Sequence, residues 1–263
     1  MKWRYIFSDF SSPYENMAID ESLFISYFDK RVPTFRIYRW KPYGFSIGYS
    51  QKAKEILNLE KCKKDNIGIV RRITGGSMIF HADELTYSIV CSESNIGNPA
   101  SIKASYKILT SFILRAYEKL GLFPKYAIEF SDIIKEKSSF CFMSQEDYDI
   151  IIKGKKIGGN AQKRKKDVIL IHGSIPLGAD YKIAQKYTKE NLLKLNIRSS
   201  CLSEVLERKI DFFEFSEILK ESFKEIFGEF EFDELDTKET NLKEELLREK
   251  YLKDSWNLYY ANT

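Results

Sequence analysis

Apolar and polar positions along the chain follow two different periods. A helix is predicted to begin at Ser12-Pro13, because serine caps a first helical turn and proline fits its first position. The stretch NMAIDESLFISYF that follows spaces its apolar residues three and four positions apart, as a helix does. The segment Thr34–Trp40 (TFRIYRW) instead alternates and is rich in strand-forming residues, which predicts a β-strand.

Further strands are predicted in adjacent groups. FSIGYS and IGIVRRI are strand candidates, MIFH and LTYSIVC indicate an antiparallel pair, and YDIIIKGKKIGGNAQKRKKDVILIHGSI indicates a meander. Residues 102–120 and most of the chain after Tyr181 are predicted to be helical. Because helices lie between groups of strands, the pattern favours an α+β fold with a mixed, largely antiparallel sheet flanked by helices. We expect one domain over residues 1–230, followed by a helical tail over residues 231–263.

Composition narrows the class of protein. The chain has 263 residues, of which 43% are hydrophobic and 30% charged, and this excludes a disordered, collagen-like or disulfide-scaffold protein. No apolar run approaches the ~20 residues of a membrane span, and the N-terminus lacks the apolar core of a secretory signal. A cytoplasmic protein without a membrane partner is therefore expected. The net charge of +4 is mild, and no nucleic-acid-binding signature is present, so no nucleic-acid partner is expected.

The two histidines of the chain each lie in a glycine-containing polar motif. His81 ends the motif RRITGGSMIFH, and His172 begins HGSI. In the first motif the tandem glycines allow a ligand to approach the backbone, while hydroxyls and an arginine offer donors. Such a loop suits an anion or a thioester carbonyl; the alternative is a hairpin bend with an exposed arginine pair. The candidate binding residues of this motif are Arg72, Gly75, Gly76, Ser77 and His81.

A second glycine-rich motif, GKKIGGNAQ, covers residues 154–162. Its small residues Gly158, Gly159 and Ala161 leave room for a ligand beside a strand. Lys156, set among these glycines, would have its pKa lowered in a tight, partly apolar cleft and could act as a base or an electrostatic partner. The alternative, a solvated basic edge, is preferred for the other lysines here, including those at residues 163–166.

The four cysteines are far apart and form no C-x-x-C pair, which indicates free thiols. Cys141 lies between two phenylalanines, an environment more typical of a core residue than of a nucleophile. A nucleophilic thiol needs a nearby cation to favour its thiolate form. Lys156 follows across a predicted strand at residues 148–152, so the two side chains could face each other.

Four motifs in order, NMAIDE, RRITGGSMIFH, GKKIGGNAQKR and HGSI, resemble the lipoate–protein ligase and octanoyltransferase family, which is related to biotin–protein ligases. The resemblance extends from Trp3 to Leu206. It implies a class II aminoacyl-tRNA synthetase/biotin synthetase-like fold whose curved sheet holds an acyl group in a tunnel. The substrate contacts expected on this basis are Arg72, Gly75, Gly76, Ser77, His81, Gly158, Gly159, Ala161 and His172.

Within that family, CFMSQEDYDIIIKGKKIGGNAQKR is similar to the cysteine-dependent octanoyltransferases. The resemblance implies that Cys141 carries the acyl thioester and that Lys156 lowers the pKa of that thiol. The Asn-Asp pair typical of ligases is not present in its usual form. The stretch after the predicted helix Phe212–Phe227 is also too short for the accessory domain of long ligases, although short ligases lack it too.

The reaction implied by the resemblance is a two-step acyl transfer. Octanoyl passes from acyl-carrier protein to Cys141, and then to a lysine of a lipoyl-domain protein or of a glycine-cleavage H-type protein, with Lys156 taking the proton of the amine. No cofactor is expected, because a thioester is already activated. Three alternatives stay open. One is a lipoate–protein ligase that uses ATP and Mg²⁺ and does not need the cysteine. The others are an octanoyl amidotransferase between lipoyl carrier proteins, and a binding module without turnover.

Overall fold

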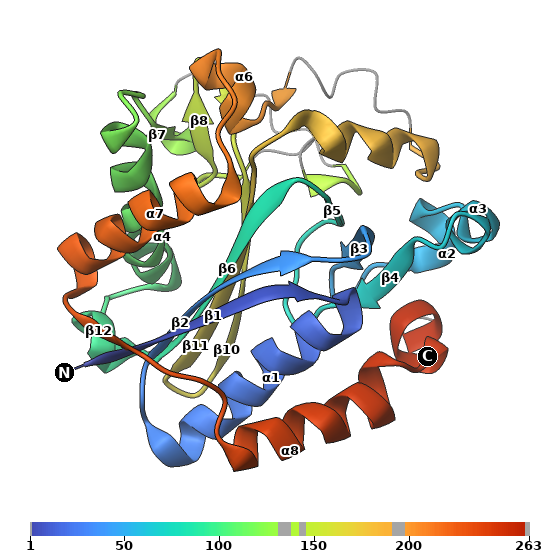
Figure 1. The fold of residues 1–263 in the computed structure, drawn as a ribbon, viewed down its shortest axis with the longest axis horizontal. Coiled ribbons are helices and arrows are strands. Elements are labelled where there is room, and N and C mark those ends of the chain that lie inside the picture. The colour runs from blue at the N-terminus through green and yellow to red at the C-terminus, as the bar shows by residue number, and fades with distance from the viewer. Residues whose placement is uncertain (1, 131–137, 142–145, 191–197, 261–263) are drawn as a thin grey trace.

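The computed structural model describes residues 2–130, 138–141, 146–190 and 198–260. Through its centre runs a six-stranded sheet in the order β10-β11-β6-β2-β1-β12 (Figure 1). The strands are β1 (Trp3–Ser11), β2 (Thr34–Trp40), β6 (Glu84–Ser92), β10 (Gly159–Lys165), β11 (Val168–Pro176) and β12 (Phe230–Phe232). β1 runs parallel to β2 and β12, and the other neighbours are antiparallel, so the predicted mixed sheet is confirmed.

Two three-stranded sheets accompany the central one, in the orders β4-β3-β5 and β7-β8-β9. Their strands are β3 (Gly44–Ile47), β4 (Gly68–Arg71), β5 (Ile79–His81), β7 (Lys125–Tyr126), β8 (Ile150–Ile152) and β9 (Lys155–Lys156). The predicted pairing of MIFH with LTYSIVC is wrong, because β5 pairs with β3 whereas β6 pairs with β2 and β11. The connection between them is anchored elsewhere: the carbonyl of Asp83 accepts from the N–H groups of Leu177 and Gly178, just beyond β11.

Helices cover both faces of the central sheet (Figure 1). Helix α1 (Pro13–Lys30) lies on one face and begins as predicted, with Ser12 Oγ accepting from the N–H of Glu15 at 3.1 Å. Helices α4 (Ile102–Lys119) and α7 (Phe212–Phe227) pack together on the other face. Successive side chains of a strand pack on opposite faces of the sheet. In β6, Ile89 packs in the core beneath α4 and α7, and Val90 packs in the core beneath α1.

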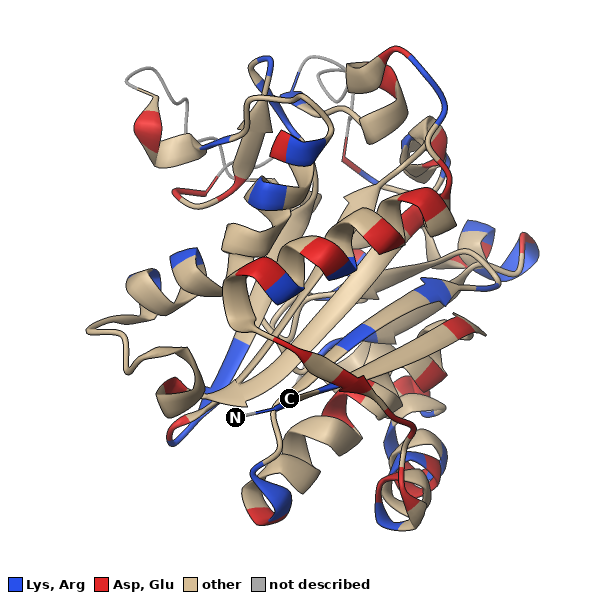
Figure 2. Ribbon diagram, turned by 60° about the vertical axis from the view of Figure 1, so that its left-hand side comes forward, with Lys and Arg blue, Asp and Glu red and all other residues tan. Residues whose placement is uncertain are grey.

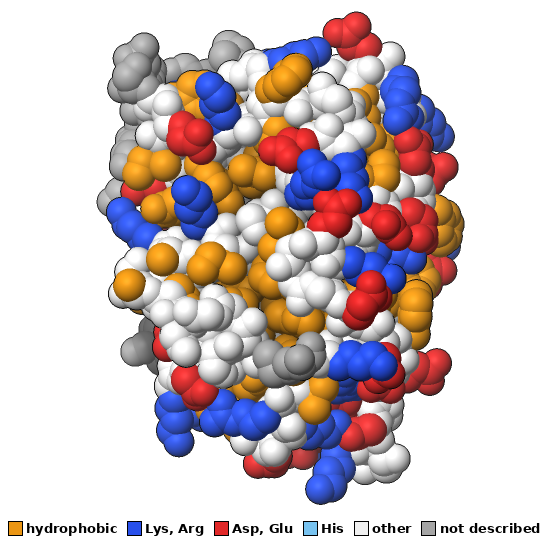
Figure 3. Space-filling model, turned by 90° about the vertical axis from the view of Figure 1, so that its left-hand side faces the viewer, with side chains coloured by type: hydrophobic (Ala, Val, Ile, Leu, Met, Phe, Trp, Pro, Cys, Tyr) orange, Lys and Arg blue, Asp and Glu red, His pale blue; other side chains and the backbone are white. Residues whose placement is uncertain are grey.

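The outer face of α7 carries a stripe of acidic residues, visible along the helix in Figure 2. The stripe consists of Glu214, Glu217, Glu221 and Glu225, all exposed, whereas Phe215, Leu219 and Phe223 of the same helix are fully buried. This three- and four-residue spacing is what a surface helix needs to pack one side only. Figure 3 shows apolar side chains on the face that carries α4 and β7, where the exposed large apolar residues are Ile102, Phe123, Ile128 and Phe130.

The C-terminal part of the chain is built into the same body. After β12 follow α8 (Thr237–Leu246), η5 (Leu247–Tyr251) and η6 (Ser255–Tyr259), and α8 lies along α1 (Figure 1). The buried Glu239 of α8 accepts from Arg4 of β1 at 2.8 Å. The predicted boundary between residues 230 and 231 falls inside β12.

Short helical pieces complete the fold: α2 (Ala53–Ile56), α3 (Leu59–Lys64), α6 (Leu202–Leu206), η1 (Glu93–Ile96), η2 (Ala127–Glu129) and η4 (Ala179–Lys186). In the part of the chain that the structure describes, no helix is long and apolar enough to span a bilayer. The four cysteines are free thiols, as predicted.

Candidate active site

A cavity of about 340 Å³ lies between the turn at residues 75–77, the N-terminal end of α4 and strand β10. Its wall includes both residues of the predicted catalytic pair, Cys141 and Lys156. The remaining lining residues are Gly75, Gly76, Ser77, Ile102, Lys103, Tyr106, Glu146, Asp147, Tyr148, Asp149, Asn160, Ala161 and Gln162. The cavity therefore joins the two glycine-rich motifs that the sequence marks as candidate binding segments.

The predicted contact between Cys141 and Lys156 is confirmed. Lys156 Nζ lies 3.5 Å from Cys141 Sγ and donates to the Cys141 carbonyl at 2.9 Å. The same ammonium forms an ion pair with Asp149 Oδ2 at 2.7 Å, and both side chains of this pair are buried. The tight hairpin between β8 and β9 brings the carboxylate and the lysine together, because Asp149 directly precedes β8 and Lys156 ends β9.

The expectation that the pKa of Lys156 is lowered is wrong. Burial does lower the pKa, but the Asp149 carboxylate and Cys141 raise it more, and the pKa of Lys156 becomes about 12. Lys156 is thus a permanent cation at neutral pH, suited to stabilise a thiolate and unsuited to accept a proton. Asp149 is not among the residues predicted from the sequence. Its only signal there is an acidic residue placed ahead of a strand that returns, through a two-residue turn, to a lysine.

The segment that carries the cysteine is anchored from several sides. Cys141 donates its N–H to the Met78 carbonyl at 2.9 Å, and the Met78 N–H donates to the Ser139 carbonyl at 2.9 Å. The Ser139 carbonyl also accepts from Gln51 Nε2 at 2.9 Å, and the Ser139 N–H donates to Glu190 Oε2 at 2.9 Å. These contacts hold the backbone of Cys141 in place, because they tie its short segment to three separate parts of the fold.

The second glycine motif leaves room for the Cys141 thiol, whereas the sequence predicted room for a ligand. A Cβ atom on Gly159 would lie 2.6 Å from Cys141 Sγ, so any other residue at this position would displace the thiol. Gly158 is required for a different reason: its φ of +95° disfavours other residues, and a Cβ there would meet the Ser174 carbonyl at 2.8 Å. Ala161 lies on the wall of the main cavity and also on that of a second, smaller one.

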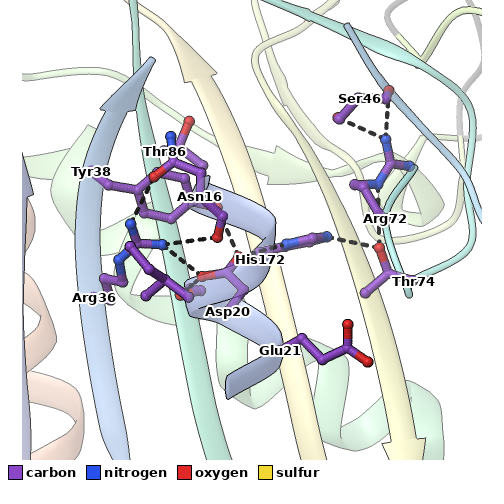
Figure 4. A network of polar contacts seen from close by, with 12 residues as sticks. Asn16, Asp20, Glu21, Arg36, Tyr38, Ser46, Arg72, Thr74, Thr86 and His172 are labelled. Atoms are coloured by element: carbon purple, nitrogen blue, oxygen red, sulfur yellow. Dashed lines mark hydrogen bonds and ion pairs between the residues drawn. The ribbon is translucent and has the colours of Figure 1, made fainter. Parts of the chain in front are cut away.

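Arg72 lies beneath the first glycine motif and is almost fully buried. Its guanidinium donates to Thr74 Oγ1 at 3.2 Å and to the Ser46 carbonyl at 2.8 Å (Figure 4). It also donates to the carbonyls of Gly75 at 2.8 Å and Ser77 at 3.1 Å. Burial lowers its pKa to about 10, so the group stays charged at neutral pH. The alternative of an exposed arginine pair is wrong, because Arg72 braces the turn at residues 75–77 from inside.

His172 belongs to a buried polar network on the α1 side of the sheet (Figure 4). Its Nδ1 lies 3.0 Å from Asp20 Oδ2, and its Nε2 lies 2.7 Å from Thr74 Oγ1. Asp20 in turn accepts from Arg36 at 2.8 Å and from the Tyr38 hydroxyl at 2.9 Å. Burial lowers the pKa of His172 despite the opposing effect of Asp20, so the imidazole is neutral at neutral pH.

His81 has a similar arrangement around it. Its Nδ1 lies 2.6 Å from Glu84 Oε1 and its Nε2 lies 2.6 Å from Ser46 Oγ, while Trp40 stacks on the ring at 3.6 Å. The structure brings Arg72 and both histidines together at the smaller cavity, whose other lining residues are Met17, Tyr38, Trp40, Ser46, Ile79, Thr86, Ala161, Gly173 and Ser174. Of the predicted binding residues, those of the turn at residues 75–77 line the main cavity, Arg72 and the two histidines line the smaller one, and Ala161 lines both. Gly158 and Gly159 line neither cavity.

The arrangement suits chemistry at a thiol in a partly enclosed cavity. A cation lies beside the sulfur, residues of both glycine motifs line the wall, and a smaller cavity lies beyond Ala161. Among the residues that the structure describes, no group of three or more histidine, cysteine, aspartate or glutamate side chains could hold a metal ion.

This fold and site define a class of protein. A family model described as "Lipoyl protein ligase A/B catalytic domain" matches residues 12–224, and the chain belongs to this family. The fold agrees: a crystal structure of lipoate-protein ligase A bound with ATP superposes with a TM-score of 0.82 at 25% identity, covering 98% of this chain and 99% of that one. A bipartite lipoate protein ligase of Thermoplasma acidophilum has the same fold, with a TM-score of 0.82, 24% identity, and coverage of 98% and 97%.

More particular relatives carry the name Octanoyltransferase LipM. That of Bacillus subtilis (strain 168) is 34% identical over 97% of this chain and 97% of its own length. That of Brevibacillus brevis is 43% identical over 68% of this chain and 67% of its own length. The family and the class II synthetase-like fold expected from the sequence motifs are therefore confirmed.

Proposed function

We propose that this protein is an octanoyltransferase that acts through a thioester on Cys141. The donor is octanoyl on acyl-carrier protein, and the acceptor is a lysine of a lipoyl-domain protein or of a glycine-cleavage H-type protein. The observation that carries the proposal is the contact of Lys156 Nζ with Cys141 Sγ on the wall of the main cavity. The relatives named as octanoyltransferases support it, since they align over most of the chain.

The first step transfers the acyl group to the enzyme. The Cys141 thiolate, stabilised by the Lys156 ammonium, attacks the thioester carbonyl carbon of the donor. A new carbon–sulfur bond forms, the donor's carbon–sulfur bond breaks, and the carrier thiolate leaves and takes a proton from water. Backbone N–H groups at residues 75–77 or 158–161 are the candidates to hold the oxyanion, and each such donor contributes roughly 3 to 4 kcal/mol in other enzymes.

The second step transfers the group to the acceptor. The neutral lysine amine of the acceptor attacks the acyl-enzyme, an amide bond forms, and the bond to Cys141 Sγ breaks. The high pKa of Lys156 removes it as the base for this step, because it already holds its proton. We therefore assign the role of proton acceptor to the departing Cys141 thiolate, which ends the step as a neutral thiol.

No metal ion or nucleotide enters this scheme, because the thioester supplies the activated acyl group. Lys156 and Asp149 then act only by charge and position. A ligase would differ in one decisive respect: it would activate a free acid with ATP and Mg²⁺ and would retain activity without the cysteine.

The experiment is intact-protein mass spectrometry of the enzyme mixed with octanoyl-acyl-carrier protein in the absence of ATP. We expect a gain of one octanoyl group that hydroxylamine removes, and no gain in Cys141→Ala. The proposal is wrong if no adduct forms and the protein instead attaches lipoate to a lipoyl domain once ATP and Mg²⁺ are added. Persistence of the adduct in Cys141→Ala would place the acyl group on another residue.

A further inference from the structure

We infer that the C-terminal segment, residues 247–259 (η5, η6 and the turn between them), positions the nucleophile through a chain of hydrogen bonds that ends two residues from Cys141. Arg71 and Gln51 are the positioning residues of this chain. The inference rests on the proposed function, because it assigns a role in acyl transfer to side chains that touch neither substrate nor sulfur.

The first link joins the C-terminal segment to Arg71. The Arg71 N–H donates to Asn257 Oδ1 at 3.0 Å, and its Nε donates to the Trp256 carbonyl at 2.8 Å. In return, Trp256 Nε1 donates to the Arg71 carbonyl at 3.0 Å. Asn257 also donates to the Tyr251 carbonyl at 2.7 Å, which closes η5 and η6 into one unit. Arg71 and Asn257 are buried, so these bonds do not compete with water.

The second link joins Arg71 to the loop that follows β3. Its Nη1 donates to the carbonyls of Gly48 at 3.1 Å, Tyr49 at 2.7 Å and Gln51 at 2.6 Å. Burial lowers the pKa of Arg71, yet the group remains charged at neutral pH. A buried cation that draws three carbonyls around itself holds them in a single arrangement, because any other would leave a charged donor without a partner.

The third link joins this loop to the nucleophile. Gln51 Oε1 accepts from the Gly48 N–H at 2.9 Å, and Gln51 Nε2 donates to the Ser139 carbonyl at 2.9 Å. Ser139 lies two residues before Cys141 in the short segment that pairs with Met78. The Tyr49 N–H also donates to the Thr74 carbonyl at 2.9 Å, directly before the turn at residues 75–77. The loop thus reaches the cavity from two sides.

This series of hydrogen bonds determines the orientation of the segment that carries Cys141. Apolar packing fixes the depth of a segment, whereas hydrogen bonds fix its rotation and register. The Cys141 sulfur must meet both the Lys156 ammonium and an incoming carbonyl, and a small misplacement of a nucleophile lowers its rate steeply. Gln51 controls the rotation of the peptide at Ser139, and the C-terminal segment controls Gln51 through Arg71.

The experiment is a double-mutant cycle on Gln51→Ala and Asn257→Ala, with Lys52→Ala as the control at an exposed neighbour of Gln51. Two rates are measured for each variant: formation of the octanoyl-enzyme, and alkylation of Cys141 by iodoacetamide. We expect each single variant to slow acyl-enzyme formation about tenfold, with the half-saturating donor concentration unchanged. The double variant should be no slower than the slower single one, because both break the same chain.

Two results would overturn the inference. One is multiplication of the two losses in the double variant, which would make the effects independent. The other is a lowered melting temperature with unchanged rates, which would make the contacts merely structural. Gln51→Glu is the second probe: it keeps the shape and loses the donor to Ser139, so it should be as slow as Gln51→Ala. If the native protein accepts no octanoyl group, the proposed function fails, and the alkylation rates still decide whether the segment positions Cys141.

Discussion

Gly159 shows how little space surrounds the nucleophile. Adding a methyl group there places carbon 2.6 Å from Cys141 Sγ, so in Gly159→Ala the sulfur must rotate away from Lys156. Its backbone is not in the left-handed region, so the fold is expected to tolerate the change. We predict a loss of about a hundredfold in the rate of octanoyl-enzyme formation with a melting temperature close to that of the native protein.

Gly158→Ala is the contrasting variant. Its φ is +95° and its added carbon meets backbone, so stability should fall. Differential scanning fluorimetry and acyl-enzyme rates separate the two effects. Equal loss of stability in both variants would show that the sulfur is not what Gly159 accommodates.

Asp149 determines the charge of Lys156 and therefore the pH range of the enzyme. In Asp149→Asn the carboxylate that raises the lysine pKa is gone, and burial acts against the ammonium with less opposition. Lys156 of the native protein has a pKa of about 12, so it keeps its charge over the usual pH range. In the variant, Lys156 loses its charge at a lower pH. We predict that the rate of acyl-enzyme formation falls with rising pH in the variant before it does so in the native protein. Parallel pH profiles would contradict this role.

The sequence predicts which residues form the site better than it predicts their charge or burial. Cys141 and Lys156 follow from the motifs, and their contact follows from the strand between them. The charge of Lys156 cannot be predicted in this way, because it depends on the Asp149 carboxylate. The hairpin of β8 and β9 brings that carboxylate to Lys156, and the sequence motifs do not show this. Likewise, the tandem glycines of residues 75 and 76 indicate a tight turn, but nothing in the sequence indicates that Arg72 is buried beneath it.

Among the secondary-structure elements, α8 is held to the rest of the fold by its buried residue Glu239. Glu239 is buried, and its contacts with Arg4 at 2.8 Å and Lys30 at 3.0 Å tie α8 to β1 and α1. Burial alone would raise the pKa of Glu239, but hydrogen bonds from these cations lower it below its usual value of 4.5. The pair therefore contributes stability above pH 4.5, and this contribution is lost as pH falls through the lowered pKa.

Glu239→Gln leaves the Arg4 charge poorly compensated, and we predict a loss of about 3 kcal/mol in the free energy of unfolding at neutral pH. Denaturant titration measures the loss, and hydrogen exchange should rise first in α8. The difference between variant and native protein should shrink as pH falls through the lowered pKa of Glu239, where the native carboxyl also becomes neutral. A difference that is independent of pH would assign the loss to packing instead.

Strands and helices with a clear period are predicted correctly from the sequence. Thr34–Trp40 is β2, and the long helix after residue 101 is α4. The pairing of strands is predicted less well. An alternating pattern indicates that a strand is half-buried, but it does not indicate which sheet the strand joins. MIFH and LTYSIVC are both strands, yet they belong to different sheets, since the Asp83 carbonyl is held by the chain beyond β11.

On the scale of the whole molecule, we expect exposed lysines of the β10–β11 turn to attract an acidic carrier protein. Lys165 and Lys166 are exposed at the turn of β10 and β11, whereas the cavity-wall residues of β10, Asn160, Ala161 and Gln162, lie toward the other end of the strand. We predict that Lys165→Glu combined with Lys166→Glu lowers kcat/KM for octanoyl-acyl-carrier protein about tenfold at low salt, through a slower association rate. The deficit should close as salt rises, because ions screen the attraction.

The matched control is Lys63→Glu combined with Lys64→Glu, an equal change of charge at an exposed pair on α3. It should leave kcat/KM close to native, and neither pair should alter alkylation of Cys141. An equal deficit in both double variants would indicate that net charge, and not a docking surface at the β10–β11 turn, sets the association rate.

The position of β12 and the C-terminal segment has a consequence for how the protein is made. The ribosome synthesises Cys141, Lys156 and Asp149 well before residues 230–259, which supply the outermost strand of the central sheet and the partners of Arg71. A nascent chain stalled between these points holds every reacting group but neither the closing strand nor the fixed loop beside the thiol. We expect a chain that ends before Asn257 to load octanoyl more slowly than the full chain, because the loop beside the thiol lacks the partners of Arg71.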